Sequence, residues 1–276
     1  MAQIHPTALV DRRAELADDV CVGAYSIIKA GVTLGAGTVV HEHCHIHGNA
    51  TLGKKCTIGP AAFVGLPPQH LKHDGANTSL IIGDNVIIRE TATVHRSIHP
   101  DPDHATRIGN RCMIMVAAHV GHDCQMGDDV MMANAALLGG HVQIGKNVFI
   151  GGGATLHQFI RVGRLAIIAG NESPSHDIPP FAAMRYLGLK GYNAIGCKRA
   201  GLTRETLHAI RTAYHCIHTN RTLPAAVAQI RERVPLVPEI QELLDFLAST
   251  RRGILPSVKA RFGGLGGSIS IEDEDL

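Results

Sequence analysis

The sequence predicts an all-β fold, a parallel β-helix of six-residue repeats, followed by a C-terminal α-helical domain. Three observations support this prediction. Aliphatic residues recur every six positions, small residues recur four positions after each of them, and glycine often follows the aliphatic residue. A period of six does not match the 3.6-residue period of an amphipathic helix, whereas a short strand and a turn fit within one repeat.

The aliphatic positions keep one register along most of the chain. From Ile4 the register runs in steps of six through Val10, Leu16, Val22, Ile28, Leu34, Val40, Ile46, Leu52, Ile58 and Val64. It resumes at Ile82, Ile88 and Val94, and again at Ile108, Ile114, Val120, Met126, Met132, Leu138, Ile144, Ile150, Leu156, Val162 and Ile168. A register this long indicates an internal structural repeat.

The small residues define a second inward position in each repeat. Cysteine occupies it four times, at Cys44, Cys56, Cys112 and Cys124. Because Ala, Val, Ser and Thr fill the same position elsewhere, we expect these cysteines to pack in the core and not to act in catalysis or metal binding. The recurrent glycines indicate a turn that the backbone makes in every repeat.

Repeats of the form I-G-x-x-x-x resemble the left-handed β-helix of hexapeptide-repeat acyltransferases. The resemblance implies that three repeats close one triangular coil, so equivalent residues stack one strand spacing apart, roughly 4.8 Å. The left-handed turn would be an exception to the usual right-handed crossover. We expect this β-helix over 1–185, with polar, proline-containing loops leaving it at 65–79 and 99–106.

A helical domain is expected over 186–255. The repeats fail after Ile168, and a proline-punctuated segment should lead out of the β-helix. Thr203 is a plausible N-cap for a first helix, and further helices are expected near 222–233 and 237–249. The glycine-rich and then acidic segment 256–276 is expected to be a disordered tail.

Composition narrows the class of protein. The formal net charge is +2 and no block of Lys or Arg stands out, so nucleic-acid binding has little support. No apolar run is long enough for a membrane span. The seven cysteines form no C-x-x-C pair, and the chain shows no secretion signal, which favours a cytoplasmic location.

Histidine is the most informative residue type, with 18 in the chain. If repeats three apart share a face, the repeats at Val94, Val120, Leu138 and Leu156 lie together. They bring to one face His95, His122, His141 and His157, with His119 at the corner that leads into the Val120 repeat. The loop with Gln69, His70 and Lys72 leaves the same face, and Asp123 should stack against His141.

Three interpretations of this cluster are open: a polar surface, a zinc site like that of γ-class carbonic anhydrases, or general-base catalysis. The adjacent pair His122 and Asp123 supports catalysis, because a carboxylate can fix the tautomer of an imidazole and stabilise its protonated form. The separate run H-E-H-C-H-I-H at 41–47 places its histidines outside the inward positions, so we expect it to be solvated.

Several motifs resemble the UDP-N-acetylglucosamine acyltransferase family, which opens lipid A synthesis. They are AHVGHDC, NAALLGGHVQIG, GGGATLHQF, PQHLK, IIRETATVHR, DIPPF, RAGLTRETLHAIRTAYH and STRRG, and they span roughly 1–253. The family transfers a 3-hydroxyacyl chain from acyl carrier protein to the 3-hydroxyl of the sugar. It is a homotrimer with sites between subunits and uses no metal or other cofactor besides the phosphopantetheine arm of the donor.

The resemblance implies roles for individual residues. His122 would be the general base, Asp123 its orienting partner, and the Gly140 N–H an oxyanion donor. Contacts to the sugar, the phosphates or the acyl carrier arm would come from His119, His141, His157, Gln158, His70, His95 and Lys72. Asn193 and Arg199 would contact the uridine nucleotide, and Gly170 would leave room for a long acyl chain.

Two departures from the family pattern bear on the acceptor. His70 stands where the family usually has Asp, and Ile195 replaces a Glu near the nucleotide site. An imidazole in place of a carboxylate changes both charge and hydrogen-bond sense, so the acceptor could be a 3-amino or other UDP-sugar. A metal-dependent hydrase and a non-catalytic scaffold are the alternatives from other classes.

Overall fold

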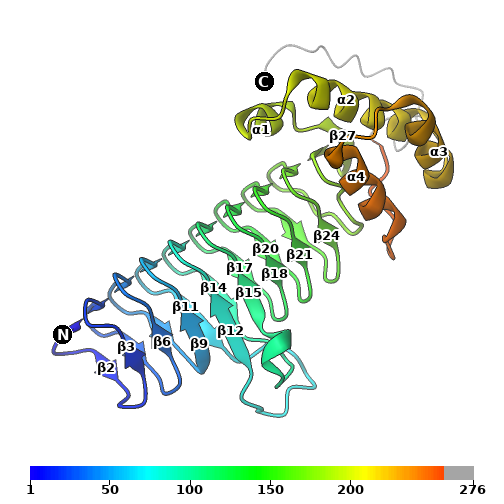
Figure 1. The fold of residues 1–276 in the computed structure, drawn as a ribbon. Helices are drawn as coiled ribbons and strands as arrows, with labels where there is room; N and C mark the ends of the chain where they lie inside the picture. Colours follow the sequence, from blue (N-terminus) through cyan, green and yellow to red (C-terminus); the bar gives the residue numbers. More distant parts are fainter. Residues whose placement is uncertain (258–276) are drawn as a thin grey trace.

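The computed structural model describes residues 1–257, which form a left-handed parallel β-helix with helices at its C-terminal end (Figure 1). The prediction of the fold class is confirmed. Within these residues no helix has the length and apolar character to cross a membrane. Apart from its first two residues, the predicted tail at 256–276 lies outside the described residues.

Short parallel strands form the three faces of the prism. Sheet A contains β1 (Gln3–Ile4), β4 (Cys21–Val22), β7 (Val39–Val40), β10 (Thr57–Ile58), β13 (Ile87–Ile88), β16 (Met113–Ile114), β19 (Met131–Met132), β22 (Phe149–Ile150), β25 (Ile167–Ile168), β26 (Ala182–Arg185) and β27 (Gly188–Tyr192). Sheet B contains β2 (Leu9–Val10), β5 (Ile27–Ile28), β8 (His45–Ile46), β11 (Phe63–Leu66), β14 (Thr93–His95), β17 (His119–Val120), β20 (Leu137–Leu138) and β23 (Thr155–Leu156). Sheet C contains β3 (Glu15–Leu16), β6 (Thr33–Leu34), β9 (Asn49–Leu52), β12 (Ser79–Ile82), β15 (Thr106–Ile108), β18 (Gln125–Met126), β21 (Gln143–Ile144) and β24 (Arg161–Val162).

The core is the inside of the prism, filled by the aliphatic and small residues of the repeat. From Val22 to Ile168 every aliphatic position of the register is buried. Ile4 is 44% exposed, because the first coil has no coil beneath it. The cysteines at the small position are buried, and burial raises the pKa of Cys124 to about 12, so these thiols are unreactive core residues.

The corners between strands use a left-handed backbone conformation. Ala135, for example, has φ 57° although it is not glycine, a conformation that costs an ordinary residue about 1–2 kcal/mol. Hydrogen bonds between successive coils offset this cost: the Ala135 N–H donates to the Val116 carbonyl at 2.9 Å. Each corner is therefore stacked on the one below it.

The two loops leave the prism without disturbing its register. The first lies between β11 and β12, and Thr57 pairs with Ile87 across it, 30 positions away. The second contains a 3-10 turn, η1 (Pro102–His104), and Thr93 pairs with His119 across it, 26 positions away. From β1 to β25, where no loop intervenes, paired residues are 18 apart.

Sheet A continues beyond Ile168, where the six-residue register ends. Strand β26 pairs in parallel with β25 and adds one more strand to sheet A within the range 1–185. Strand β27 then returns antiparallel to β26. The range 186–255, expected to be helical, therefore begins with a strand. The proline-rich segment between β25 and β26 interrupts the sequence pattern but not the sheet.

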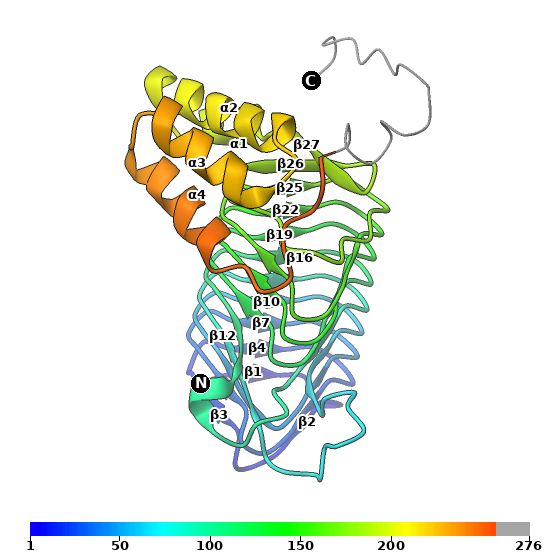
Figure 2. The ribbon, with the colours of Figure 1, turned by 90° about the vertical axis from the view of Figure 1, so that its right-hand side faces the viewer.

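The helices pack at the C-terminal end of the prism (Figure 2). They are α1 (Ala194–Arg199), α2 (Arg204–Thr219), α3 (Leu223–Arg233) and α4 (Pro238–Ala248). The side chain of Thr203 caps α2, as predicted, and α3 and α4 each have a proline in the first turn. Helix α1 was not predicted. After α4 the chain runs back to the β-helix, where Ile254 bridges to Asp177.

Candidate active site

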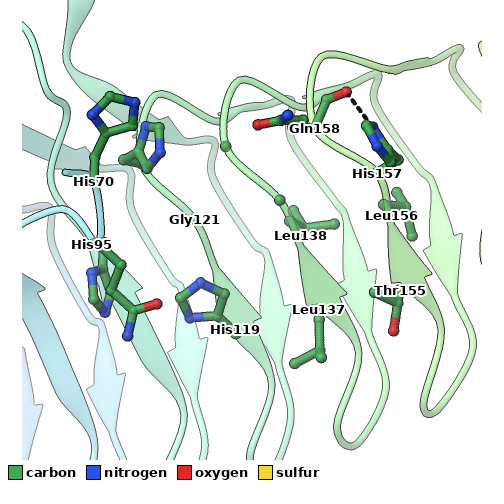
Figure 3. A pocket seen from close by; sticks show the side chains of 14 residues that line it. His70, His95, His119, Gly121, Leu137, Leu138, Thr155, Leu156, His157 and Gln158 are labelled. Carbon is green, nitrogen blue, oxygen red and sulfur yellow. Dashed lines mark hydrogen bonds between the residues drawn. The ribbon is translucent and has the colours of Figure 1, made fainter. Parts of the chain in front are cut away.

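A groove of about 440 Å³ lies on sheet B, where the repeat register gathers the histidines (Figure 3). It is lined by Gln69, His70, His95, His119, Gly121, His122, Leu137, Leu138, Gly139, Gly140, Thr155, Leu156, His157 and Gln158. Strands β14, β17, β20 and β23 contribute in order, because they are neighbours in one sheet. The first loop adds Gln69 and His70 at the β14 end of the groove.

His122 and Asp123 form a buried pair at the corner after β17. His122 Nδ1 lies 2.6 Å from Asp123 Oδ2, and the two side chains are 11% and 6% exposed. Asp123 occupies the left-handed corner of its coil, with φ 60°. Its N–H donates to Thr106 Oγ1 at 2.8 Å, which fixes the corner to the coil below.

The coil below also holds the carboxylate of Asp123. Ser97 Oγ donates to Oδ1 at 2.6 Å, and the Ile98 N–H donates to Oδ2 at 3.3 Å. Burial alone would raise the pKa of Asp123, but the hydrogen bonds from His122, Ser97 and Ile98 outweigh it and hold this pKa below its ordinary value. An ionised carboxylate only accepts, so the His122 proton lies on Nδ1 and the lone pair on Nε2.

Gly140 lies directly against the ring of His122. A Cβ at this position would come within 2.5 Å of His122 Cε1, so only glycine fits here. Its carbonyl accepts from the Phe159 N–H at 3.1 Å. Among residues 1–257 its own N–H has no acceptor, which leaves a backbone donor open beside the imidazole.

The other imidazoles surround this pair. His70 and His141 each approach His122 edge-on, with ring centroids 5.3 and 5.1 Å from that of His122. His141 also stacks flat on Phe159, at 4.4 Å between centroids. His95 packs against His119 at 5.1 Å.

Three of these histidines are kept neutral by their surroundings. Burial, together with the neighbouring imidazoles of His95 and His122, lowers the pKa of His119 to about 4. Burial also lowers the pKa of His95 and of His141. The groove therefore offers uncharged imidazoles at neutral pH, which hydrogen-bond to hydroxyl groups without adding charge.

The position of His119 differs from the sequence-based expectation. It is the first residue of β17 and not a corner residue, and its Nδ1 lies 2.7 Å from Thr93 Oγ1 of β14. The corner before β17 lies at 116–117, where Ala117 has φ 57°, so the expected corner at 119 was two residues too late. Position 119 is the outward first position of the strand. His119 still lines the groove.

Six predicted site residues are not among those that line the groove of this chain: Asp123 and His141, which contact His122, and Lys72, Arg199, Asn193 and Gly170. Lys72 is exposed on the first loop, and Arg199 is exposed at the end of α1. Asn193 caps α1, and its side chain donates to the Leu165 carbonyl at 2.8 Å. Gly170 follows β25 of sheet A, where an added Cβ would lie 3.0 Å from the Gly152 carbonyl oxygen.

Sequence reasoning missed the residues that support the site from below. Ser97 and Thr106 are ordinary polar residues in sequence, and nothing in their composition marks them. The signal that could have found Ser97 is positional, since it lies one coil below Asp123 at the equivalent place in the repeat. Leu137 and Thr155, the outward residues of β20 and β23, form the groove wall and follow from the same register.

The metal interpretation can be tested on the same atoms. Ligand atoms of His122, Asp123 and His141 lie within 4.8 Å of one another, a donor set that suits a divalent cation. An ion there would have to replace the 2.6 Å hydrogen bond between His122 and Asp123, which satisfies both atoms as they stand. The geometry favours an imidazole–carboxylate pair over a metal centre.

The histidine run at 41–47 lies away from the groove. His41 and His43 are exposed, and His45 and His47 are half-buried. His45 packs against Phe63 at 5.0 Å between ring centroids. Within the described part of the chain, none of these residues belongs to a group of side chains that could hold a metal.

A hexapeptide β-helix with an imidazole–carboxylate pair and an open backbone N–H in a sheet-lined groove defines the class of hexapeptide-repeat acyltransferases. The family model described as UDP N-acetylglucosamine O-acyltransferase, domain 2, matches residues 177–255. The chain belongs to the UDP-N-acetylglucosamine O-acyltransferase family, and it is an acyltransferase.

Relatives and solved structures support this membership over nearly the whole chain. The acyl-[acyl-carrier-protein]–UDP-N-acetylglucosamine O-acyltransferase of Azorhizobium caulinodans is 48% identical over 250 residues, covering 90% of this chain and 92% of its own. That of Sulfurihydrogenibium sp. is 46% identical over 264 residues, covering 95% and 97%. The structure of the Francisella novicida UDP-N-acetylglucosamine acyltransferase superposes with a TM-score of 0.88 at 29% identity, covering 99% and 100%.

Proposed function

We propose that His122 is the general base of an acyl-[acyl-carrier-protein]–UDP-N-acetylglucosamine O-acyltransferase that catalyses the first step of lipid A biosynthesis. The observation that carries the proposal is the buried 2.6 Å contact between His122 Nδ1 and Asp123 Oδ2, with Nε2 left free beside the groove. The relatives that are similar over most of the chain carry the name of this activity.

In this mechanism His122 Nε2 takes the proton of the sugar 3-hydroxyl while the hydroxyl oxygen attacks the thioester carbonyl of a 3-hydroxyacyl carrier protein. The tetrahedral intermediate carries its negative charge on the former carbonyl oxygen, and the open N–H of Gly140 is placed to stabilise it. Collapse breaks the carbon–sulfur bond, and the imidazolium returns the proton to the departing phosphopantetheine sulfur. Asp123 stabilises the imidazolium between these steps.

The substrates would be held by neutral groups in the groove and beside it. His119, His95 and His141 have lowered pKa values because they are buried, so they suit sugar hydroxyls better than phosphates. His70 and Gln158 line opposite ends of the groove (Figure 3), and Lys72, on the same loop as His70, supplies a cation for the phosphates. No metal or further cofactor enters this proposal; the seven free cysteines fit a reducing cytoplasm.

A homotrimer with sites between subunits is part of the proposal. The outward residues of sheet A form an apolar ladder that includes Ile87, Met131 and Phe149, each more than a third exposed in the single chain. The outward residues of sheet C are polar, with Gln125, Gln143 and Arg161 in successive coils. A neighbouring copy that covers sheet A would bury the ladder and bring corner residues such as Gly170 towards a groove on sheet B.

The acceptor is the part of the proposal with a specific rival. His70 lies edge-on to His122, within 5.3 Å between ring centroids, so it is close enough to contact the group that is acylated. At this position a 3-amino UDP-sugar would present an amine instead of a hydroxyl. Mass spectrometry of the products formed from equal amounts of the two acceptors, with carrier proteins of graded acyl length, distinguishes them.

The general-base role is tested by substituting both members of the pair. We expect His122→Gln to lower kcat by at least about 100-fold, because general-base catalysis contributes about 10²–10⁴. Asp123→Asn should also lower kcat, because an amide can donate to Nδ1 and select the wrong tautomer. Release of free carrier-protein thiol in the presence of UDP-N-acetylglucosamine measures both.

His43→Gln is the matched control, since His43 is an exposed corner histidine between β7 and β8, away from the groove. Its turnover should equal that of the unaltered chain. Unchanged kcat in His122→Gln, with the fold intact by circular dichroism, would contradict the general-base role.

A further inference from the structure

The segment after α4 crosses the last coils of the β-helix and is fixed there by a buried carboxylate. Asp177 is 1% exposed, and its side chain accepts from Thr250 Oγ1 at 2.8 Å. Its N–H donates to the Gly253 carbonyl, and its carbonyl accepts from the Leu255 N–H, both at 3.0 Å. The backbone is therefore anchored on both sides of Arg252.

From this segment Arg252 reaches the end of the groove that is opposite the first loop, where Figure 3 shows His157 and Gln158. Its Nη1 donates to the Gln158 carbonyl and lies 3.2 Å from His157 Nδ1. A guanidinium Nη1 carries two hydrogens and no lone pair. It can serve both acceptors at once, but only if His157 Nδ1 is unprotonated.

This contact bears on where neutral His157 carries its proton. His157 Nδ1 also lies 3.1 Å from the Gln158 carbonyl oxygen, to which a protonated Nδ1 would donate. Arg252 Nη1 already donates to that carbonyl, and the Nδ1 lone pair is the acceptor within reach of its second hydrogen. His157 can accept that hydrogen only in the tautomer whose proton is on Nε2.

We propose that Arg252 is a positioning residue that keeps His157 Nε2–H as a fixed hydrogen-bond donor at the far end of the groove. The group recognised there is a substrate oxygen with a free lone pair. The inference rests on the proposed function, in which the sugar nucleotide and the acyl carrier arm both present such oxygens. The two ends of the groove then differ in chemistry: His122 accepts a proton through Nε2, whereas His157 donates through Nε2.

Steady-state kinetics test this role through three variants. Arg252→Met keeps the length of the side chain and removes its donors, and we expect kcat/KM to fall roughly tenfold, the worth of one hydrogen bond with a charged partner. The loss should appear in KM with kcat within about twofold, as for a contact that is equal in ground and transition states. Arg252→Lys should recover part of the lost kcat/KM, because an ammonium also donates hydrogen bonds.

Arg251→Met is the matched control, since Arg251 is the exposed neighbour in the same segment, and it should leave both constants unchanged. In a double variant with His157→Gln, Arg252→Met should add no further loss, because both changes remove the same contact. Additive losses, or equal losses in Arg251→Met and Arg252→Met, would overturn the proposal.

Nitrogen NMR of the ¹⁵N-histidine-labelled protein reads the tautomer without turnover, with His157→Gln assigning the signal. In the unaltered chain Nδ1 of His157 should show the shift of a bare nitrogen and Nε2 that of an N–H. Arg252→Met should move Nδ1 towards the protonated shift. An unchanged tautomer in Arg252→Met would refute the positioning role, even if His122 variants had already established the reaction.

Discussion

Asp123 connects the groove to the coils beneath it through a single carboxylate. It accepts from Ser97 and Ile98 below and faces His122 above. These contacts favour its ionised form, so its contribution to stability is present above its ordinary pKa and is lost as the pH falls through the lower folded value. The same contacts that favour ionisation also fix the tautomer of His122.

His119 gives the protein a predictable response to acid. Its pKa is about 4 in the folded chain, compared with 6.5 for an ordinary histidine. Between these values the unfolded state binds more protons than the folded state. The contribution of His119 to the free energy of unfolding is therefore fully present above about pH 6.5 and falls as the pH approaches 4. Urea midpoints from pH 7.5 to 4.5 should fall less steeply for His119→Gln than for the unaltered chain. Equal slopes would contradict this assignment.

At the scale of residues, the sequence predicts which residues form the site better than it predicts the contacts between them. The register places His95, His122, His141 and His157 on one face because strand order follows from a fixed period. The hydrogen bonds to Asp123 depend on backbone conformation at the corner, which no composition rule encodes. The contact of Arg252 with His157 joins positions 95 apart, across a hairpin and four helices, and no repeat predicts it.

The corner is the element that makes the prism. Asp123, His141 and Phe159 occupy one corner in successive coils, each with φ near 60°. Their side chains therefore stack in a column: His141 lies flat on Phe159, and its Nε2 is 3.8 Å from Asp123 Oδ2. Each corner conformation is energetically costly, and at these three corners it produces the column of outward side chains that the site needs.

The corner conformation reverses the usual effect of glycine. At Ala135, exposed and with φ 57°, Ala135→Gly relieves about 1–2 kcal/mol of backbone strain against about 0.4–1 kcal/mol of added unfolded-state entropy. We expect a gain of about 0.5–1 kcal/mol in the free energy of unfolding, measured by chemical denaturation. The adjacent inward Ala136, which is buried, is the control, and Ala136→Gly should destabilise the protein. A loss of stability in Ala135→Gly would contradict the strain argument.

The β-helix is predictable at the scale of elements because its signal is repeated in every coil. The C-terminal part has no such redundancy. Thr203 marked the start of α2, but the short α1 and the hairpin strand β27 lack periodicity of their own. Strand β26 lies within the range 1–185 expected for the β-helix but outside the six-residue register, because its partner, β25, lies across a proline-rich segment; pairing with a sheet edge overrides local sequence signals.

At the scale of the whole molecule, the apolar ladder of sheet A makes the predicted assembly testable. Phe149→Glu places a charge where a neighbouring copy would cover the ladder, and an unpaired buried charge is strongly unfavourable. We expect this variant to be monomeric by light scattering and to lose activity together with assembly. Gln143→Glu, at the same strand position on polar sheet C, should stay assembled and active. A trimeric Phe149→Glu variant would show that the interface lies elsewhere.

The separation of paired residues has a consequence for length changes during evolution. Extra residues in the two loops leave every later strand in its own sheet, as the pairs Thr57–Ile87 and Thr93–His119 show. Loss of one six-residue unit between His122 and His141 would instead move all later strands to the adjacent sheet and separate the two imidazoles. Homologues that keep the site should therefore differ in loop length or by whole coils, and single repeats should be neither gained nor lost inside the span that holds the groove.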